Sequence, residues 1–228
     1  MSANTTELLK MELWKQYGTK EIPSEWDGRI YGGGKLSQRF WEYHKTIEML
    51  DLHKDSVLLD IGGGSPEHGT GFFTGIAANY ISKVIILDSN ANVEKNKFKN
   101  VEIIPQNANY DLLKKILSEN KITHISCISV FEHISDEVRI DMVKAINEFS
   151  KAEKIAVTLE YHATHTYFEH QLTTKTLSNL FLPLNNYYLS GYHKAPTHCI
   201  NALKANQDLS IELWYPLALE FRKNIETK

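Results

Sequence analysis

The chain has 228 residues, enough for one large domain with a substantial hydrophobic core. Hydrophobic residues make up 42% and charged residues 23%, and the formal net charge is −3, so the composition implies no bulk attraction to nucleic acid or to an anionic membrane. The two cysteines, Cys127 and Cys199, form no C-x-x-C pair, which favours a reduced protein. No signal peptide or membrane-spanning segment is indicated, so we expect a cytoplasmic protein.

The first part of the chain, residues 1–52, predicts a helical cap and a lid over the rest of the domain. Residues 36–52 are expected to form a helix, because their apolar side chains recur at helical spacing. These side chains are Leu36, Phe40, Tyr43, Ile47 and Leu50. The preceding residues 23–35 (PSEWDGRIYGGGK) predict a glycine-rich loop, which is either a lid or a plain surface turn.

The middle of the chain, residues 53–160, alternates between strand-like and helix-like segments. Five unbroken apolar runs predict strands covered on both faces, at residues 56–61, 83–88, 101–105, 125–130 and 155–160. The intervening segments predict helices at residues 70–81, 91–97, 110–119 and 136–149. This alternation predicts a Rossmann-like α/β fold with a mostly parallel sheet and helices on both faces.

The last part, residues 161–228, is expected to complete the sheet and to form the acceptor side of the site. Residues 173–182 predict a helix, and three later segments predict strands that are at least partly antiparallel, at residues 187–192, 199–204 and 210–215. We find no repeat or linker, so we predict one domain over residues 1–228, with a seven-stranded sheet.

The most informative motif runs from Ser56 to Pro66 (SVLLDIGGGSP), where a strand leads into a glycine turn and then into a predicted helix. Gly62 and Gly64 allow close approach of a ligand to the backbone, and the free N–H groups of a helix start could face it. Asp60 places a carboxylate at the carboxyl edge of the strand, which is where open α/β sheets bind ligands.

A dinucleotide site is the main alternative, and charge argues against it. The pattern G-x-G-x-x-G would require glycine at position 67, which is Glu67. A diphosphate would be repelled by Asp60 and Glu67, whereas a sulfonium cation with an amino group would be attracted. A further alternative is an α/β domain in which the acids at the strand ends only cap turns.

Residues 55–160 resemble the class I S-adenosylmethionine-dependent methyltransferases. The stretch from Asp60 to Gly64 matches the family's first motif, Asp88 matches the acidic residue that ends its second strand, and Ser129-x-x-Glu132-His133 matches a motif after its fourth strand. The resemblance implies that the glycine loop wraps the methionine part of S-adenosylmethionine and that Asp88 binds the ribose hydroxyls. The implied cofactor-binding residues are Asp60, Gly62, Gly63, Gly64, Asp88, Ser89, Asn107, Ala108, Val130 and Phe131.

Two positions depart from the family pattern. Asn107 stands where an acidic residue often faces the adenine amino group, although its amide oxygen can still accept that hydrogen bond. Pro66 stands where many relatives have a further glycine, which leaves the shape of the loop open.

The acceptor side is rich in histidine, which titrates near neutrality and suits a general base. His133, His162 and His165 are the candidate catalytic residues, and each could instead be structural. A metal site of His162, His165, Glu169 and His170 matches no known spacing, so we expect no metal. The predicted substrate-binding residues are Tyr31, Lys35, Arg39, Glu132, Tyr161 and His198.

The resemblance implies an enzyme that uses S-adenosylmethionine and releases S-adenosylhomocysteine. We expect O-methylation of a small polar or anionic acceptor by a monomer or homodimer, with no nucleic-acid or membrane partner. Residues 26–29 and 31–35 also resemble methyltransferases of bacterial surface-polysaccharide pathways, which suggests a glycan precursor, a phosphate or a phosphoramidate. The alternatives are an N-methyltransferase, a cofactor-binding module without activity and a nicotinamide oxidoreductase.

Overall fold

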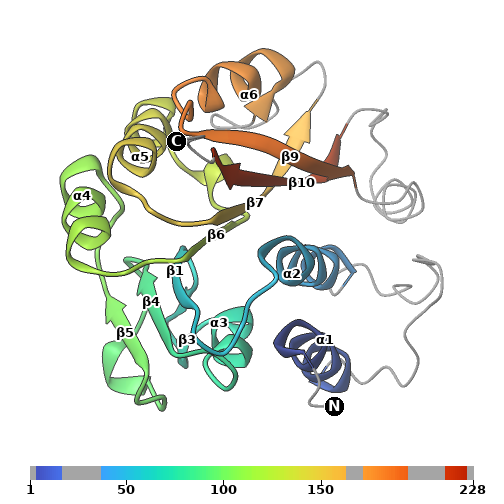
Figure 1. Ribbon diagram of the computed structural model, residues 1–228, viewed down its shortest axis with the longest axis vertical. Coiled ribbons are helices and arrows are strands. Elements are labelled where there is room, and N and C mark those ends of the chain that lie inside the picture. Colours follow the sequence, from blue (N-terminus) through green and yellow to red (C-terminus); the bar gives the residue numbers. More distant parts are fainter. Residues whose placement is uncertain (1–3, 17–36, 163–171, 195–213, 225–228) are drawn as a thin grey trace.

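The computed structural model describes residues 4–16, 37–162, 172–194 and 214–224 (Figure 1). Its central sheet has the strand order β5-β4-β1-β6-β7-β10-β9, with the short β8 paired to β7. The strands from β5 to β7 pair in parallel, whereas β10 is antiparallel to both β7 and β9. Their bounds are β1 (Val57–Ile61), β4 (Lys83–Leu87), β5 (Val101–Ile104), β6 (His124–Ile128), β7 (Lys154–His162), β8 (Leu172–Thr173), β9 (Tyr187–Lys194) and β10 (Trp214–Lys223).

Helices cover both faces of the sheet and bury two separate hydrophobic cores (Figure 1). The bounds of the helices are α1 (Thr5–Gln16), α2 (Ser37–Leu50), α3 (Phe72–Ala77), α4 (Tyr110–Glu119), α5 (Asp136–Phe149) and α6 (Thr174–Phe181). Neighbouring residues on β1 alternate between the cores: Leu58 packs with α1, α2 and α3, whereas Leu59 packs with α4, α5 and α6. The central strands β1 and β4 are therefore buried on both sides, which is why their sequences are largely apolar.

These features confirm the predicted fold class. The five predicted strands of the middle region form within two residues of their expected bounds, and the N-terminal segment supplies a helical cap in α1 and α2. Cys127, within one of these strands, is buried in a core. Within the described ranges, no helix combines the length and the hydropathy that crossing a membrane would require.

Two predicted helices of the middle region are wrong in extent. Instead of a helix over residues 70–81, a small hairpin of β2 (Gly64–Ser65) and β3 (Gly69–Thr70) precedes the short α3. Gly69 has a left-handed backbone, with φ +79°, and Thr70 after it pairs with Gly64 across the hairpin, so the helix begins only at Phe72. Residues 91–97 form only a 3₁₀ turn, Val93–Lys95, which ends where the backbone of Asn96 becomes extended and its side-chain amide donates to the carbonyls of Phe98 and Val101.

The last strand of the sheet also differs from its prediction. β10 runs to Lys223, so the predicted strand at residues 210–215 covers only its start, and residues 210–213 lie outside the described ranges. In the second half of β10, Glu220 and Arg222 alternate with Leu219 and Phe221, which obscures the apolar run. The predicted strand at residues 199–204 falls outside the described residues.

Candidate functional site

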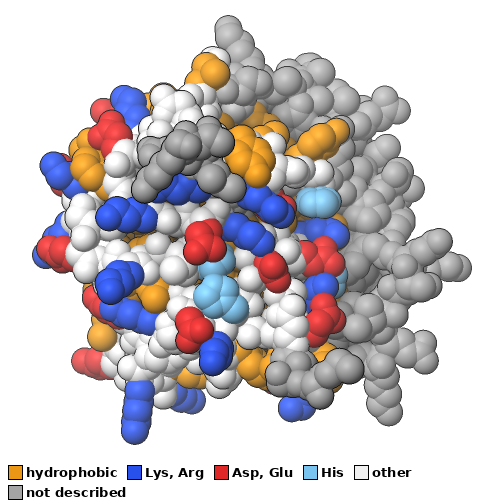
Figure 2. Space-filling view, in the orientation of Figure 1, with side chains coloured by type: hydrophobic (Ala, Val, Ile, Leu, Met, Phe, Trp, Pro, Cys, Tyr) orange, Lys and Arg blue, Asp and Glu red, His pale blue; other side chains and the backbone are white. Residues whose placement is uncertain are grey.

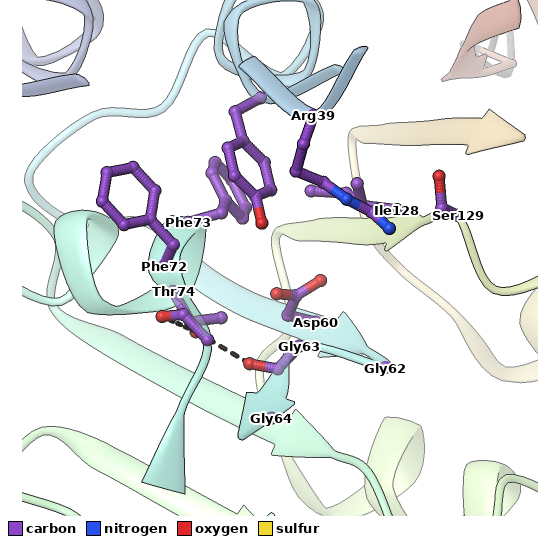
Figure 3. A pocket seen from close by; sticks show the side chains of 12 residues that line it. Arg39, Asp60, Gly62, Gly63, Gly64, Phe72, Phe73, Thr74, Ile128 and Ser129 are labelled. Atoms are coloured by element: carbon purple, nitrogen blue, oxygen red, sulfur yellow. Dashed lines mark hydrogen bonds between the residues drawn. The ribbon is translucent and has the colours of Figure 1, made fainter. Parts of the chain in front are cut away.

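A cleft with a volume of about 240 Å³ opens at the carboxyl ends of β1 and β6 (Figure 3). Its walls come from four segments: α2, the turn after β1, the start of α3 and the end of β6. The described residues that line it are Arg39, Tyr43, Asp60, Gly62, Gly63, Gly64, Gly71, Phe72, Phe73, Thr74, Ile128 and Ser129. The cleft thus lies where a ligand of an open α/β sheet is expected.

The glycine turn forms the floor of the cleft, and its close packing explains its composition. Gly62 has φ +79°, and a Cβ atom there would lie 2.2 Å from Cγ2 of Val130. A Cβ atom on Gly63 would lie 2.0 Å from Oδ2 of Asp60, so a side chain there would fill the space in front of the carboxylate. The carbonyl oxygen of Gly63 accepts hydrogen bonds from the amide of Gly71 (2.7 Å) and the hydroxyl of Thr74 (2.9 Å), which fixes the turn.

This arrangement corrects one detail of the motif. Between the glycines and the helix, which was predicted from residue 70, the β2–β3 hairpin intervenes, and Pro66 lies in its turn region. The α3 helix follows at Phe72 and has only six residues. The ligand surface at this point is therefore built from the glycine backbone and the first residues of α3, and not from a long helix terminus.

Asp60 is the buried acid of the cleft. Its side chain is 1% exposed and its Oδ1 atom accepts a hydrogen bond of 2.6 Å from the hydroxyl of Ser126. Burial, together with a smaller effect from the charge of Asp88, raises the pKa of Asp60 to about 7, while the hydrogen bond from Ser126 opposes the change. A carboxylate desolvated in this way would be stabilised by a cation placed beside it.

We expect the stability of the unliganded protein to fall as the pH rises through the titration of Asp60. The folded protein holds this proton at higher pH than the unfolded chain does. The protonated carboxyl therefore makes its full contribution to the free energy of unfolding below its ordinary pKa, and this contribution is lost as the pH rises to about 7. The Asp60→Asn variant cannot ionise, so above pH 7 it should be the more stable protein, by at most about 4 kcal/mol. Denaturant unfolding at several pH values measures this difference, and an equal pH dependence in both proteins would contradict it.

Asp88 follows β4 and holds the neighbouring loops. Its Oδ2 atom accepts a hydrogen bond of 2.9 Å from the amide of Gly64, and its Oδ1 atom accepts one of 2.8 Å from the amide of Asn90. Because a carboxylate oxygen can accept more than one hydrogen bond, both oxygens can still receive ribose hydroxyl groups. Asp88 is half-buried and Ser89 is exposed, so both are accessible from the surface.

The other predicted cofactor residues are placed at the same edge of the sheet. Asn107 is exposed after β5, and Ala108 packs partly against a core. Val130 is half-buried behind Gly62, whereas the Phe131 ring packs in the core at 5.8 Å from the Phe181 ring. Phe131 can therefore reach a ligand only through its backbone. The roles of these residues stay predictions.

The predicted acceptor residues separate in the structure. His133 is exposed at the end of a 3₁₀ turn, and Glu132 beside it is buried, with Arg139 close enough to interact electrostatically. Arg39 lines the cleft from α2. The structure therefore gives His133 and Glu132 different environments, although they are adjacent in the sequence.

Several predicted residues cannot be placed. Tyr31, Lys35, His165 and His198 lie outside the described residues, as do Glu169 and His170. Tyr161 and His162 end β7, but only their backbone is described. In the described part of the chain, no group of three or more His, Cys, Asp or Glu residues is placed to hold a metal ion.

The structure also brings to the cleft residues that the sequence did not indicate as site residues. Tyr43 lies against both Phe72 and Phe73 in stacked arrangements, with ring centroids 5.7 and 6.2 Å apart, and these aromatic side chains form one wall of the cleft. Glu42 lies behind the cleft, where it contacts Arg39 and Ser129. The only sequence signal for Glu42 is an acidic residue beside the apolar positions of a predicted helix.

Comparison with known proteins gives a consistent result for the fold. No family model and no curated protein sequence matches the chain. Among solved structures it resembles a cyclopropane synthase from Mycobacterium tuberculosis, with a TM-score of 0.59 and 13% identity over 80% of this chain and 83% of that chain. It also resembles a geranyl diphosphate C-methyltransferase from Streptomyces coelicolor, with a TM-score of 0.61 and 12% identity over 91% of this chain and 86% of that one.

A third similar structure is an N-methyltransferase from Bradyrhizobium japonicum in complex with S-adenosylhomocysteine. The TM-score is 0.57, with 12% identity over 98% of this chain and 100% of that chain. Identities this low show the fold alone. The chain has the class I methyltransferase fold, as predicted, while the resemblance to surface-polysaccharide methyltransferases is not shown by these comparisons.

Proposed function

We propose that the protein is an S-adenosylmethionine-dependent methyltransferase that acts on a small polar acceptor. The observation that carries this proposal is the buried Asp60 carboxylate in front of the glycine turn. Such a site favours a ligand with positive charge and disfavours a diphosphate. Solved structures with the same fold include a methyltransferase in complex with S-adenosylhomocysteine, which supports this cofactor over a nicotinamide dinucleotide.

The residues at the cleft fit the parts of S-adenosylmethionine. The glycine turn leaves room for the amino-acid end, and Asp60 faces its positive charge. Arg39, on another wall of the same cleft, supplies a guanidinium for the carboxylate of that end. Asp88 would receive the ribose hydroxyls and Asn107 would face the adenine. The bound cofactor supplies an activated methyl group, and the protein orients the acceptor towards it.

For the acceptor we propose a hydroxyl group of a small polar metabolite or glycan precursor, including one that carries a phosphate or phosphoramidate. On the face seen in Figure 2, the described acidic and basic side chains are interspersed and form no continuous basic stripe, which favours a small acceptor over nucleic acid. N-methylation is the alternative, since solved structures with this fold include an N-methyltransferase as well as a C-methyltransferase.

Calorimetry with S-adenosylhomocysteine and NAD tests the cofactor, and Asp88 provides the decisive variant. We expect the wild type to bind S-adenosylhomocysteine and not NAD. Asp88→Ala should weaken S-adenosylhomocysteine binding by about 1–3 kcal/mol, because a hydrogen bond to a charged partner is lost. Asp88→Asn should lose less, since its amide oxygen can still accept one hydrogen bond.

Asp55→Asn is the matched control, because it removes an exposed carboxylate at the other end of β1 and should leave binding unchanged. Unaltered affinity in folded Asp88→Ala would overturn the ribose assignment. Tight binding of NAD instead would overturn the proposed function. Methyl transfer to a panel of alcohols and amines then separates an enzyme from a cofactor-binding module without activity.

A further inference from the structure

The end of β6 carries a buried hydrogen-bonded pair that the proposed cofactor site does not use. The hydroxyl of Ser129 donates to Oε1 of Glu42 over 2.6 Å, and both side chains are buried, with exposed fractions of 7% and 0%. The other oxygen of Glu42 lies 3.1 Å from a guanidinium nitrogen of Arg39, one turn earlier on α2. The helix α2 thus places a carboxylate against the hydroxyl of Ser129, a residue that lines the cleft (Figure 3).

The backbone at Ser129 is unusual. Its φ is +49°, in the left-handed region that residues with a side chain seldom adopt, and its amide donates to the carbonyl of Thr158 over 2.9 Å. Such strain costs free energy and persists where the surrounding structure requires it, commonly at functional positions. Here it accompanies a side chain that both lines the cleft and reaches the buried Glu42.

The sheet order places Ser129 on the acceptor side of the cleft. β1 lies between β4, which leads to Asp88, and β6, which leads to Ser129. If the cofactor is bound by the ends of β1 and β4, an acceptor must approach from the side of β6. Asp60 and Ser129 line the same cleft, so a molecule bound at the glycine turn would have Ser129 at its other side.

We propose that Ser129, positioned by Glu42, accepts a hydrogen bond from the N–H or O–H group of the acceptor beside the cofactor. This inference rests on the proposed function and narrows its acceptor. Because the hydrogen of the Ser129 hydroxyl is directed to Glu42, the oxygen meets a ligand in the cleft as a hydrogen-bond acceptor. The pair therefore selects an alcohol or an amine that still carries hydrogen, and disfavours an anionic oxygen or an apolar carbon. Arg39 is paired with Glu42, so it adds no uncompensated positive charge there.

Sinefungin tests this without knowledge of the natural acceptor. This analogue carries an amino group where S-adenosylmethionine carries its reactive methyl, so its N–H groups point to the acceptor side, whereas S-adenosylhomocysteine has no group there. We expect the wild type to bind sinefungin more tightly than S-adenosylhomocysteine in calorimetry. In Ser129→Ala, this preference should fall by at least about tenfold, because a hydrogen bond to a charged group is lost. The affinity for S-adenosylhomocysteine should stay within about twofold of the wild type, because that ligand lacks the amino group.

Ser129→Gly separates the hydroxyl from the backbone strain. Glycine tolerates positive φ, so this variant should be at least as stable as Ser129→Ala yet lose the same preference for sinefungin. Glu42→Gln should also reduce the preference, since the carboxylate charge behind Ser129 is removed. Ser56→Ala, at a buried serine before β1, is the control and should keep the wild-type preference.

The outcomes separate the two proposals. If the wild type binds neither ligand, the proposed function is wrong and the inference is wrong with it. If the wild type binds S-adenosylhomocysteine and both Ser129 variants keep the full preference for sinefungin, the inference alone is overturned. Loss of the preference in Ser129→Ala, Ser129→Gly and Glu42→Gln together, with S-adenosylhomocysteine affinity retained in the two Ser129 variants, supports it.

Discussion

Asp60→Asn is expected to weaken the binding of S-adenosylmethionine by about 10- to 100-fold, because a charged hydrogen-bonding partner of the cofactor is replaced by a neutral amide. The fold should survive, since the asparagine oxygen can accept the hydrogen bond of 2.6 Å that Ser126 now donates to Asp60. Binding of S-adenosylhomocysteine should weaken less, because this product lacks the sulfonium charge. Calorimetry with both ligands measures the two losses, and Asp55→Asn controls for the removal of one exposed carboxylate.

The same carboxylate makes the affinity depend on pH in a defined direction. In the unliganded cleft the pKa of Asp60 is raised to about 7, mainly by burial, whereas the cationic cofactor prefers the ionised form. Affinity should therefore rise with pH, by up to about tenfold per unit, and level off above about pH 7. Binding near pH 6 should release protons, which calorimetry in two buffers of different ionisation enthalpy detects. A flat profile in the wild type, or an equal rise in Asp60→Asn, would contradict this.

Asp60 thus connects binding to stability. Above pH 7 its buried charge destabilises the unliganded fold, and a cation in the cleft would offset that cost. A neutral residue at this position would make a more stable protein with a weaker site. Such a trade-off between stability and binding is expected wherever a charged side chain is desolvated to bind a ligand. It is the reason that Asp60→Asn should raise the free energy of unfolding above pH 7 and weaken the binding of S-adenosylmethionine.

The features predicted best from the sequence are those with short-range signals. A strand buried on both faces needs an unbroken apolar run, and the strand containing Asp60 shows one directly before its glycines. The positions of Asp60 and Asp88 follow from the same pattern, since each lies at or near the end of a predicted strand. Chain order alone then brings Asp60 and Asp88 to one edge of the parallel sheet.

The features that were missed depend on contacts between distant residues. Glu42 and Ser129 are 87 residues apart, and nothing in the helix pattern around Glu42 indicates that it meets β6. The β2–β3 hairpin was not predicted, because the apolar residues after position 70 indicate a helix. Nothing local in the sequence indicates that Gly69 adopts a left-handed backbone. In the same way, Val130 gives no sign in the sequence that it packs behind Gly62. Tertiary packing decided each of these cases.

Gly62→Ala is expected to disrupt the site more than any surface change, since alanine is unfavourable there for two separate reasons. The backbone has φ +79°, and the new methyl group would lie 2.2 Å from Cγ2 of Val130. The left-handed backbone and the collision together should destabilise the fold by about 1–3 kcal/mol. The turn must then move, and we expect S-adenosylhomocysteine affinity to fall at least about tenfold, on the scale of a hydrogen bond to a charged group. Denaturant unfolding and calorimetry measure the two effects.

Two further variants separate these reasons. Gly62→Ala combined with Val130→Ala removes the collision and leaves only the backbone cost, so the double variant should lose less binding than the sum of the two single variants. Gly75→Ala is the matched control, because a Cβ atom there would lie 3.4 Å from the nearest side chain and Gly75 is inside α3. It should be neutral or stabilise the fold by up to about 1 kcal/mol. If Gly62→Ala behaved like Gly75→Ala, with stability and S-adenosylhomocysteine affinity both retained, the glycine turn would not be the surface that holds the cofactor.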